Sequence, residues 1–252
     1  ILKMSLHTAS KARVISPMSY SKKLMDLHSV PFQDVCFPSA EMNVETRSDG
    51  SLIVTSVVEL KEYIPNLSVV ISQQAKDRPE QAYLKERDLN GQWLSINYAE
   101  VFRDSSAVAA WLLIQDIKNL RPVLILSGNS IHHAVLKYGA MAAQIPVCPV
   151  SINYSLIGGD YGRLNYVINM LNPAVIFAEH TERYKTVLDS VDFGDAIIIT
   201  ANPDILNCSA IAMADILKTD ISEQVNESIY SIDPDVPAVY MLTSGSPSLP
   251  KA

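Results

Sequence analysis

The residues best suited to chemistry lie together in the segment YMLTSGSPSLPKA, residues 240–252. An apolar run there meets a loop that contains hydroxyl side chains, a glycine and a lysine. Loops that hold nucleotide phosphates need converging backbone N–H groups, hydroxyl donors and a lysine beside a helix N-terminus. The segment therefore predicts a phosphate-binding loop, with ligand contacts from Thr243, Ser244, Gly245, Ser246 and Lys251.

The loop does not follow the GxxxxGK[ST] pattern. Pro250 stands where the second glycine of that pattern belongs, and no serine or threonine follows Lys251. An ordinary surface loop rich in Ser, Gly and Pro is the alternative interpretation of the same residues.

Three other groups of polar residues are weaker candidates. His132 and His133 are adjacent, and neighbouring helix residues point about 100° apart, so they are expected on a helix surface rather than as joint metal ligands. Glu179 and His180 form a possible acid–base pair. The run 153–155 (NYS) follows an expected strand, where open α/β sheets bind ligands, although it can equally be a loop that seats the next helix.

Charge and composition limit the possible partners. The chain has 252 residues and a net charge of −7, with a pI of about 5.2. Nucleic-acid binding needs a basic face, so we expect no nucleic-acid partner. No uninterrupted apolar run reaches the ~18 residues of a membrane span. Cys36, Cys148 and Cys208 form no CxxC pair and are expected to be reduced thiols of a cytoplasmic protein.

Residues 1–30 differ from the rest of the chain. Five basic residues face a single acidic one there, among six serines, which weakly resembles an organellar transit peptide. The simpler interpretation is a disordered leader or sequence upstream of the first methionine, Met4. We expect residues 1–30 to be a disordered leader and residues 31–252 to be folded.

Two hairpins are expected before the main body of the fold. Strand-like runs at 42–47 and 51–57 flank Ser-Asp-Gly, and runs at 82–86 and 93–96 flank Asn-Gly. Two asparagines are placed to start helices. Asn66 precedes a run with Leu67, Val70, Ile71 and Ala75 on one side, and Asn97 is followed three residues later by Glu100, close to a capping box.

From residue 122 onward, strand and helix patterns alternate. Such alternation implies a parallel sheet wrapped by helices. The expected strands are 122–126, 146–150, 174–178 and 196–200, and the expected helices are 131–143, 160–171 and 181–188, with Ser130 and Thr181 available as caps. The expected fold class is therefore α/β, with a partly parallel sheet, flanking helices and N-terminal β-hairpins.

The region after residue 202 gives a weaker pattern. Residues 211–217 are expected to be a short helix, 221–230 are ambiguous, and 236–243 are expected to be the last strand. Val239 and Met241 would lie on the same side of that strand. We expect this face to be exposed and the isolated chain to have limited solubility.

Several segments resemble the AMP-forming adenylating enzymes. Residues 243–251 (TSGSPSLPK) resemble the phosphate loop TSGSTGLPK of that family. Residues 125–134 (ILSGNSIHHA), 139–143 (GAMAA) and 146–156 (PVCPVSINYSL) resemble feruloyl-CoA synthetases in particular. Residues 32–35, 47–50, 160–164 and 171–178 continue this resemblance, which covers about residues 31–252.

The resemblance implies an acid–thiol ligase. Such enzymes use ATP and Mg²⁺ to convert a small carboxylic acid, here a hydroxycinnamate such as ferulate, to an acyl-adenylate, and CoA then displaces AMP. The loop would act by positioning phosphates and stabilising the charge that moves onto pyrophosphate. Residues 31–252 would be a partial N-terminal adenylation domain, truncated at the phosphate loop.

The loop departs from the family pattern at two positions. Pro247 replaces a threonine and removes both a hydroxyl and a backbone N–H. Ser248 replaces a glycine, which is costly if the backbone there needs a positive φ. We expect the chain alone to be inactive and to bind ATP, Mg²⁺ and CoA weakly. A non-catalytic remnant, an interaction module and one half of a split enzyme remain as alternatives.

Overall fold

The computed structural model describes residues 41–64, 66–88, 90–156, 159–243 and 250–251. The expected leader 1–30 lies outside these ranges. The chain divides into two units, residues 1–62 and residues 63–252.

In the described part of the first unit, a single antiparallel hairpin is formed by β1 (Met42–Thr46) and β2 (Leu52–Ser56). Gly50 has φ +79° in the turn, where its N–H donates to the carbonyl of Arg47, so the predicted hairpin is confirmed. Cross-strand register places Val44 opposite Val54. Both side chains are exposed in this unit.

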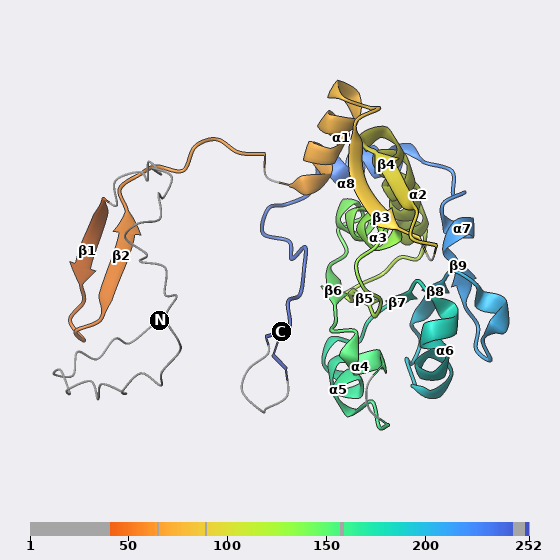
Figure 1. Ribbon diagram of the computed structural model, residues 1–252. Helices are drawn as coiled ribbons and strands as arrows, with labels where there is room; N and C mark the ends of the chain where they lie inside the picture. The colour runs from red at the N-terminus through yellow and green to blue at the C-terminus, as the bar shows by residue number, and fades with distance from the viewer. Residues whose placement is uncertain (1–40, 65, 89, 157–158, 244–249, 252) are drawn as a thin grey trace, which may run out of the picture. The chain divides into compact units, whose positions relative to one another are not determined.

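The second unit contains a five-stranded, fully parallel sheet in the order β6-β5-β7-β8-β9 (Figure 1). Its strands are β5 (Val123–Ile125), β6 (Val147–Pro149), β7 (Val175–Ala178), β8 (Ile197–Thr200) and β9 (Ile211–Ala212). The chain moves from β5 to one neighbour, β6, and then returns to the other side of β5 to form β7. This reversal is the switch point typical of doubly wound sheets, and the α/β fold class is confirmed.

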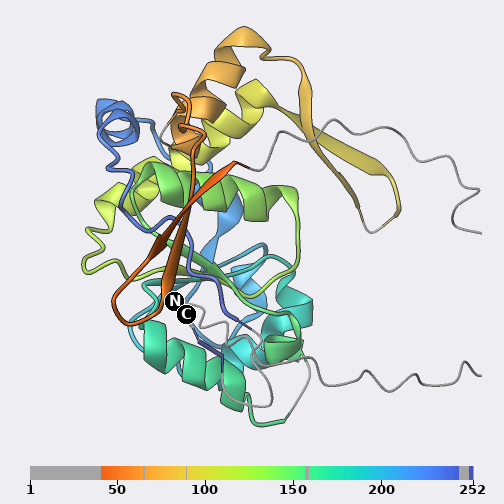
Figure 2. The ribbon, with the colours of Figure 1, turned by 90° about the vertical axis from the view of Figure 1, so that its left-hand side faces the viewer.

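Alternate residues of the strands enter two separate hydrophobic cores. One core contains Val123, Ile125, Val175 and Phe177, and the other contains Leu124 and Ile176 with further residues of the same strands. Helices cover both faces, with α2 and α3 on one side of the sheet and α5 and α6 on the other (Figures 1 and 2). Because both faces are buried, the short strands are almost entirely apolar, as the sequence indicates.

The helices of the second unit have the following bounds: α1 (Leu67–Asp77), α2 (Tyr98–Ile114), α3 (Ile131–Ala142), α4 (Asn153–Leu156), α5 (Gly162–Leu171), α6 (Thr181–Ser190), α7 (Met213–Ile216) and α8 (Glu223–Tyr230). A second hairpin consists of β3 (Ala82–Arg87) and β4 (Trp93–Asn97), as predicted. No helix within the described residues is both long and apolar enough to cross a membrane.

Three predicted helix starts are confirmed by their hydrogen bonds. The side chain of Asn66 accepts from the N–H of Val69, and that of Ser130 accepts from the N–H of His133. Asn97 and Glu100 form a complete capping box at the start of α2. These caps satisfy backbone donors that have no partner inside the helix, so local sequence determines where each helix begins.

Some expectations need correction. Thr181 does not cap α6, whose N-cap is His180, because the Thr181 hydroxyl is buried and bonds to Thr200 at 2.6 Å and to the N–H of Asn202 at 2.8 Å. Residues 211–217 are not one helix, since the first two pair with β8 as strand β9. Of the expected apolar side of α1, Ile71 is buried, Val70 and Ala75 are half-buried, and Leu67 is exposed, while Ser68 and Ser72 are also buried.

Candidate functional site

The segment that leads to the predicted phosphate loop runs beside β6. The N–H of Val147 donates to the carbonyl of Ala238 at 3.0 Å, and the N–H of Tyr240 donates to the carbonyl of Val147 at 2.8 Å. This pairing is parallel, so the segment reaches the same carboxyl edge of the sheet as β6. The following loop therefore begins at the edge where open α/β sheets bind ligands.

The segment is shorter as a strand than predicted. Residues 236–243 were expected to form a full strand, but pairing with β6 is limited to a bridge at Val239. Pro149 explains the limit, because the next bond of the ladder would need a backbone N–H that proline lacks. Val239 and Met241 were both expected to be exposed. Met241 is 77% exposed in this unit, but Val239 is half-buried against a core, so the expectation holds for Met241 alone.

The two ends of the predicted loop lie together. The N–H of Thr243 donates to the carbonyl of Lys251 at 2.9 Å, and the Thr243 hydroxyl lies 3.3 Å from the same oxygen. These bonds close the loop at its base, with both residues exposed. Ser244, Gly245 and Ser246 lie outside the described residues, as do Pro247 and Ser248. The structure thus brings together Thr243 and Lys251 from the predicted set.

A polar cleft lies near the carboxyl end of β6. It has a volume of about 370 Å³ and is lined by Asn153, Tyr154, Asp160, Tyr161, Gly162 and Arg163. The guanidinium of Arg163 lies 5.9 Å from the centre of the Tyr154 ring, within the range of a cation–π contact. Residues 153–155, for which a loop was the simpler expectation, belong to the short helix α4.

The switch point between β5 and β7 has a different chemistry. His132, in the first turn of α3, has its Nδ1 2.8 Å from Oε1 of Glu179, which directly follows β7. The N–H of Ile131 donates to Oε2 of Glu86 at 2.8 Å. Two carboxylates therefore already occupy the positive N-terminus of α3, where an anionic ligand would otherwise bind.

Electrostatics stabilise this arrangement. The hydrogen bond to Glu179 raises the pKa of the His132 imidazole, and the charges of Glu86 and Asp104 raise it further. Burial lowers this pKa, but its effect is smaller. Burial alone would raise the pKa of Glu179, but hydrogen bonds with His132 and Ser130 outweigh it and lower that pKa. The charged form of each group is thus favoured by its neighbours.

The histidine and carboxylate partners differ from those considered in the sequence. Glu179 bonds to His132, 47 residues away, rather than forming the considered pair with His180. His133 lies 3.0 Å through Nδ1 from the carbonyl of Gly128, so the adjacent histidines have different partners. In the sequence, the one feature that could have indicated the bond between His132 and Glu179 is that each residue closely follows an expected strand, and these strands, β5 and β7, are neighbours in the sheet. No cluster of three or more possible metal-ligating residues occurs within the described ranges.

The two described cysteines are free thiols. Cys148 is fully buried in β6, and burial raises the pKa of its thiol to about 11. Burial is also the main cause of the raised pKa of Cys208. The thiolate is the nucleophilic form, so neither environment activates its cysteine for catalysis. Cys36 lies outside the described residues.

Comparison with known families identifies the class of protein. The model of the AMP-binding enzyme family matches residues 71–252, which is most of the chain. The chain therefore belongs to the AMP-binding enzyme family. Its phosphate-loop resemblance and its fold agree with this assignment. A search of curated proteins found no match.

Two of the solved structures with a similar fold contain a bound adenylate. A fatty acyl-adenylate ligase from Legionella pneumophila, in complex with acyl adenylate and pyrophosphate, has a TM-score of 0.54 at 17% identity, over 75% of this chain and 30% of the ligase. McyG A-PCP, complexed with phenylalanyl-adenylate, has a TM-score of 0.56 at 16% identity, over 76% and 28%. VinN, in complex with 3-methylaspartate, has a TM-score of 0.50 at 19% identity, over 73% and 45%. The chain thus spans less than half the length of these proteins.

Proposed function

We propose that this chain is the N-terminal part of an ATP-dependent ligase that activates a small carboxylic acid as an acyl-adenylate. The observation that carries the proposal is the loop base formed by Thr243 and Lys251, in a chain that belongs to the AMP-binding enzyme family. The loop starts at the carboxyl edge of a parallel sheet, which is the usual ligand edge of this architecture.

In this function the acid's carboxylate attacks the α-phosphorus of ATP, and pyrophosphate leaves. The loop would hold the β- and γ-phosphates through backbone N–H groups and hydroxyls, and Lys251 would balance the negative charge that accumulates on pyrophosphate. Backbone pairing between Thr243 and Lys251 keeps these two residues together before the nucleotide arrives.

Mg²⁺ would enter as part of the nucleotide complex. It prefers oxygen ligands and is often bound through one or two carboxylates together with substrate phosphates. Thr243 and Lys251, which form the described base of the loop, provide no carboxylate. These two residues would therefore not bind Mg²⁺ directly, and the phosphates of ATP would supply its main ligands.

The finer assignment is a feruloyl-CoA synthetase-like enzyme, with a hydroxycinnamate as the acid and CoA as the thiol. It rests on the resemblance of residues 125–156 to that subgroup. The domain assignment proposed with it is a leader at 1–30 and a partial adenylation domain at 31–252.

The chain alone is proposed to be inactive. Pro247 and Ser248 remove a hydroxyl, an N–H and a glycine from the phosphate loop, and hydrogen bonds to charged ligands contribute about 1.5–3 kcal/mol each. Loss of two donors would reduce rate or affinity by roughly a few hundredfold. A non-catalytic interaction module and one half of a split enzyme are the alternatives.

Acid-dependent ATP–pyrophosphate exchange tests this proposal. The purified chain should show no exchange above a blank without acid, with ferulate, a medium-chain fatty acid or aspartate as the acid. Exchange that depends on any of these acids would disprove inactivity. If the purified chain shows exchange and Lys251→Ala abolishes it, the proposed inactivity would be wrong but the ligase assignment would be supported.

A further inference from the structure

We propose that the hairpin of the first unit joins two copies of this chain, with β1 of one copy pairing antiparallel with β1 of the other across a two-fold axis. The two hairpins would then form one four-stranded sheet in the order β2-β1-β1-β2. Within the described residues, β2 is the only strand that pairs with β1, so the outer edge of β1 meets no other strand (Figure 1). This association is independent of the ligase reaction proposed above.

The hairpin is smaller than an independently stable sheet. It has two strands, whereas three or more strands with an apolar face are usually needed for stability in water. Cross-strand pairs place Met42, Val44, Leu52 and Val54 on one face of the hairpin, where these side chains are 54–61% exposed. Pairing through β1 would bring the Val44 side chains of the two copies next to each other and extend the sheet to four strands.

The hydrogen bonds inside the hairpin determine which backbone groups point to the outer edge of β1. The N–H of Arg47 donates to the carbonyl of Ser51 at 2.8 Å, and the carbonyl of Glu41 accepts from the opposite residue of β2 at 3.4 Å. Odd-numbered residues therefore point toward β2, and successive residues of a strand alternate in direction. The residues whose N–H and carbonyl groups point to the outer edge are Met42, Val44 and Thr46.

Charge favours one register for the pairing of two β1 strands. A register centred on Val44 pairs all five residues of β1 through the outward backbone groups, and it places Arg47 opposite Glu41 of the second copy at both ends. The same register places Asn43 opposite Glu45 of the second copy. Centring one residue earlier would oppose Glu41 and Glu45, and centring one residue later would oppose the two copies of Glu45. Like charges directly opposite are destabilising, so the strand is complementary to itself in the central register.

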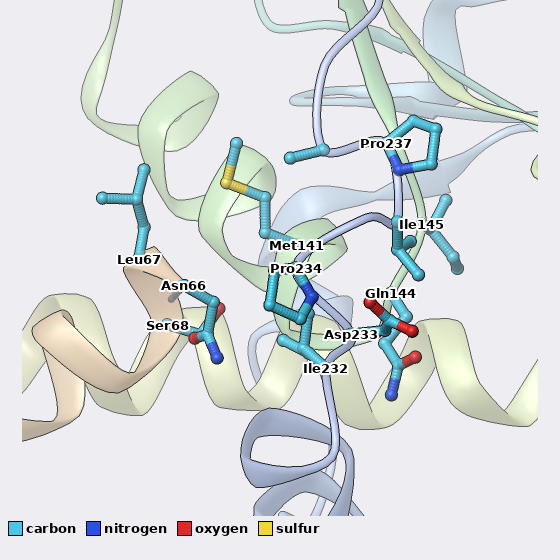
Figure 3. A pocket seen from close by; sticks show the side chains of 12 residues that line it. Asn66, Leu67, Ser68, Met141, Gln144, Ile145, Ile232, Asp233, Pro234 and Pro237 are labelled. Carbon is cyan, nitrogen blue, oxygen red and sulfur yellow. The ribbon is translucent and has the colours of Figure 1, made fainter. Parts of the chain in front are cut away.

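An apolar pocket in the second unit lacks such a pattern. It has a volume of about 150 Å³ and lies near the start of α1, the end of α3 and the segment after α8 (Figure 3). Asp233 is the only charged residue among the described residues that line it. The pocket therefore carries no arrangement of charges that selects a partner, whereas the outer edge of β1 carries one that fits a second copy of itself.

Sedimentation velocity of the full chain measures this association. The natural chain should form dimers with twice the 27.7 kDa mass of one chain. The Kd should be about 10–100 µM, because pairing of one short strand buries less surface than a standard interface. A chain that stays monomeric across this range would overturn the proposal, and so would assemblies larger than dimers, because a two-fold contact closes on itself.

Charge variants test the register. Arg47→Glu would oppose two negative charges at each end of the pairing, and Glu41→Arg would oppose two positive charges. Each variant alone should therefore dimerise at least about tenfold more weakly than the natural chain. An equal mixture of the two variants should recover the natural affinity, because opposite charges would again meet at both ends. A mixture that dimerises no better than the separate variants would overturn the proposed pairing.

Proline variants test which edge of the hairpin is used. Val44→Pro removes an N–H that points to the outer edge of β1 and takes no part in the pairing with β2, so it should abolish the dimer. Val54 lies directly opposite Val44, and Val54→Pro removes the equivalent N–H from the outer edge of β2. This matched control should keep the natural Kd. Equal dimerisation of the two variants, or loss of the dimer in both, would overturn pairing through β1.

Discussion

Two crevices at the carboxyl edge of the same sheet have opposite chemistry. Between β5 and β7, Glu86 and Glu179 already occupy the start of α3, and His132 balances part of their charge. Beside β6, Thr243 and Lys251 close the base of a loop and contribute a hydroxyl and a lysine side chain. Topology alone would favour the first crevice for a ligand, but its carboxylates make it unsuitable for phosphates.

The comparison also shows how differently the crevices are supported. Side chains from three separate parts of the chain hold the first one together. Two backbone hydrogen bonds to Val147 attach the segment beside the second, because Pro149 cannot extend the ladder. The site proposed for phosphate is therefore the more weakly anchored of the two.

The largest expected effect is at Gly139, because α3 begins at the first crevice and packs closely against α2 through this residue. A Cβ at Gly139 would lie 2.5 Å from the Cβ of Val108 and 2.8 Å from the carbonyl oxygen of Ser105, so α2 and α3 would have to separate. Gly139→Ala should lower the free energy of unfolding by about 3 kcal/mol. Urea denaturation would measure it.

Gly128→Ala is the matched control, since a Cβ there meets nothing within 4 Å. It should change the free energy of unfolding by less than about 0.5 kcal/mol. Equal stability of the Gly139→Ala and Gly128→Ala variants would show that α2 and α3 are not packed as closely as described.

A smaller effect is expected from His132→Ala, and it should depend on pH. The raised pKa of His132 means that its stabilising charge is fully present below its ordinary value of 6.5 and is lost as pH rises through the folded pKa. The lowered pKa of Glu179 means that its contribution is present above 4.5 and is lost as pH falls through its folded pKa. The pair should therefore contribute most between about pH 5 and 6.5.

Within that window, His132→Ala should cost about 1 kcal/mol, a modest value because the His132 side chain is 42% exposed. The cost should decrease by pH 9. Urea unfolding at pH 5.8 and pH 9 measures both values, with His133→Ala as the neighbouring control. A cost that is constant with pH, or equal in the two variants, would contradict the ion pair.

Local features of the sequence were predicted well. Asn66, Asn97 and Ser130 start their helices, and Gly50 turns its hairpin, because each effect depends on residues only a few positions apart. The alternation of apolar strands and helices was sufficient to predict the parallel sheet. The role of Thr243 and Lys251 in binding phosphate stays a prediction from a contiguous motif, and the backbone bond between them was not predicted.

Features that depend on distant residues were not predicted. The bond between His132 and Glu179 requires knowing that β5 and β7 are neighbours. Thr181 was assigned as a cap because the sequence does not show its partner Thr200 on the adjacent strand. The short pairing beside β6 arises from Pro149, whose missing N–H matters only when the partner strand is known.

The most direct test of the central claim is a calorimetric titration with ATP and Mg²⁺. The natural chain should bind weakly, and Pro247→Thr with Ser248→Gly should bind at least about tenfold more tightly, because a hydroxyl, a backbone N–H and a glycine return to the loop. Adding Lys251→Ala should remove this gain, whereas adding Glu179→Gln at the other crevice should not. Tight binding by the natural chain, or a loss of binding with Glu179→Gln but not with Lys251→Ala, would contradict the placement of the nucleotide.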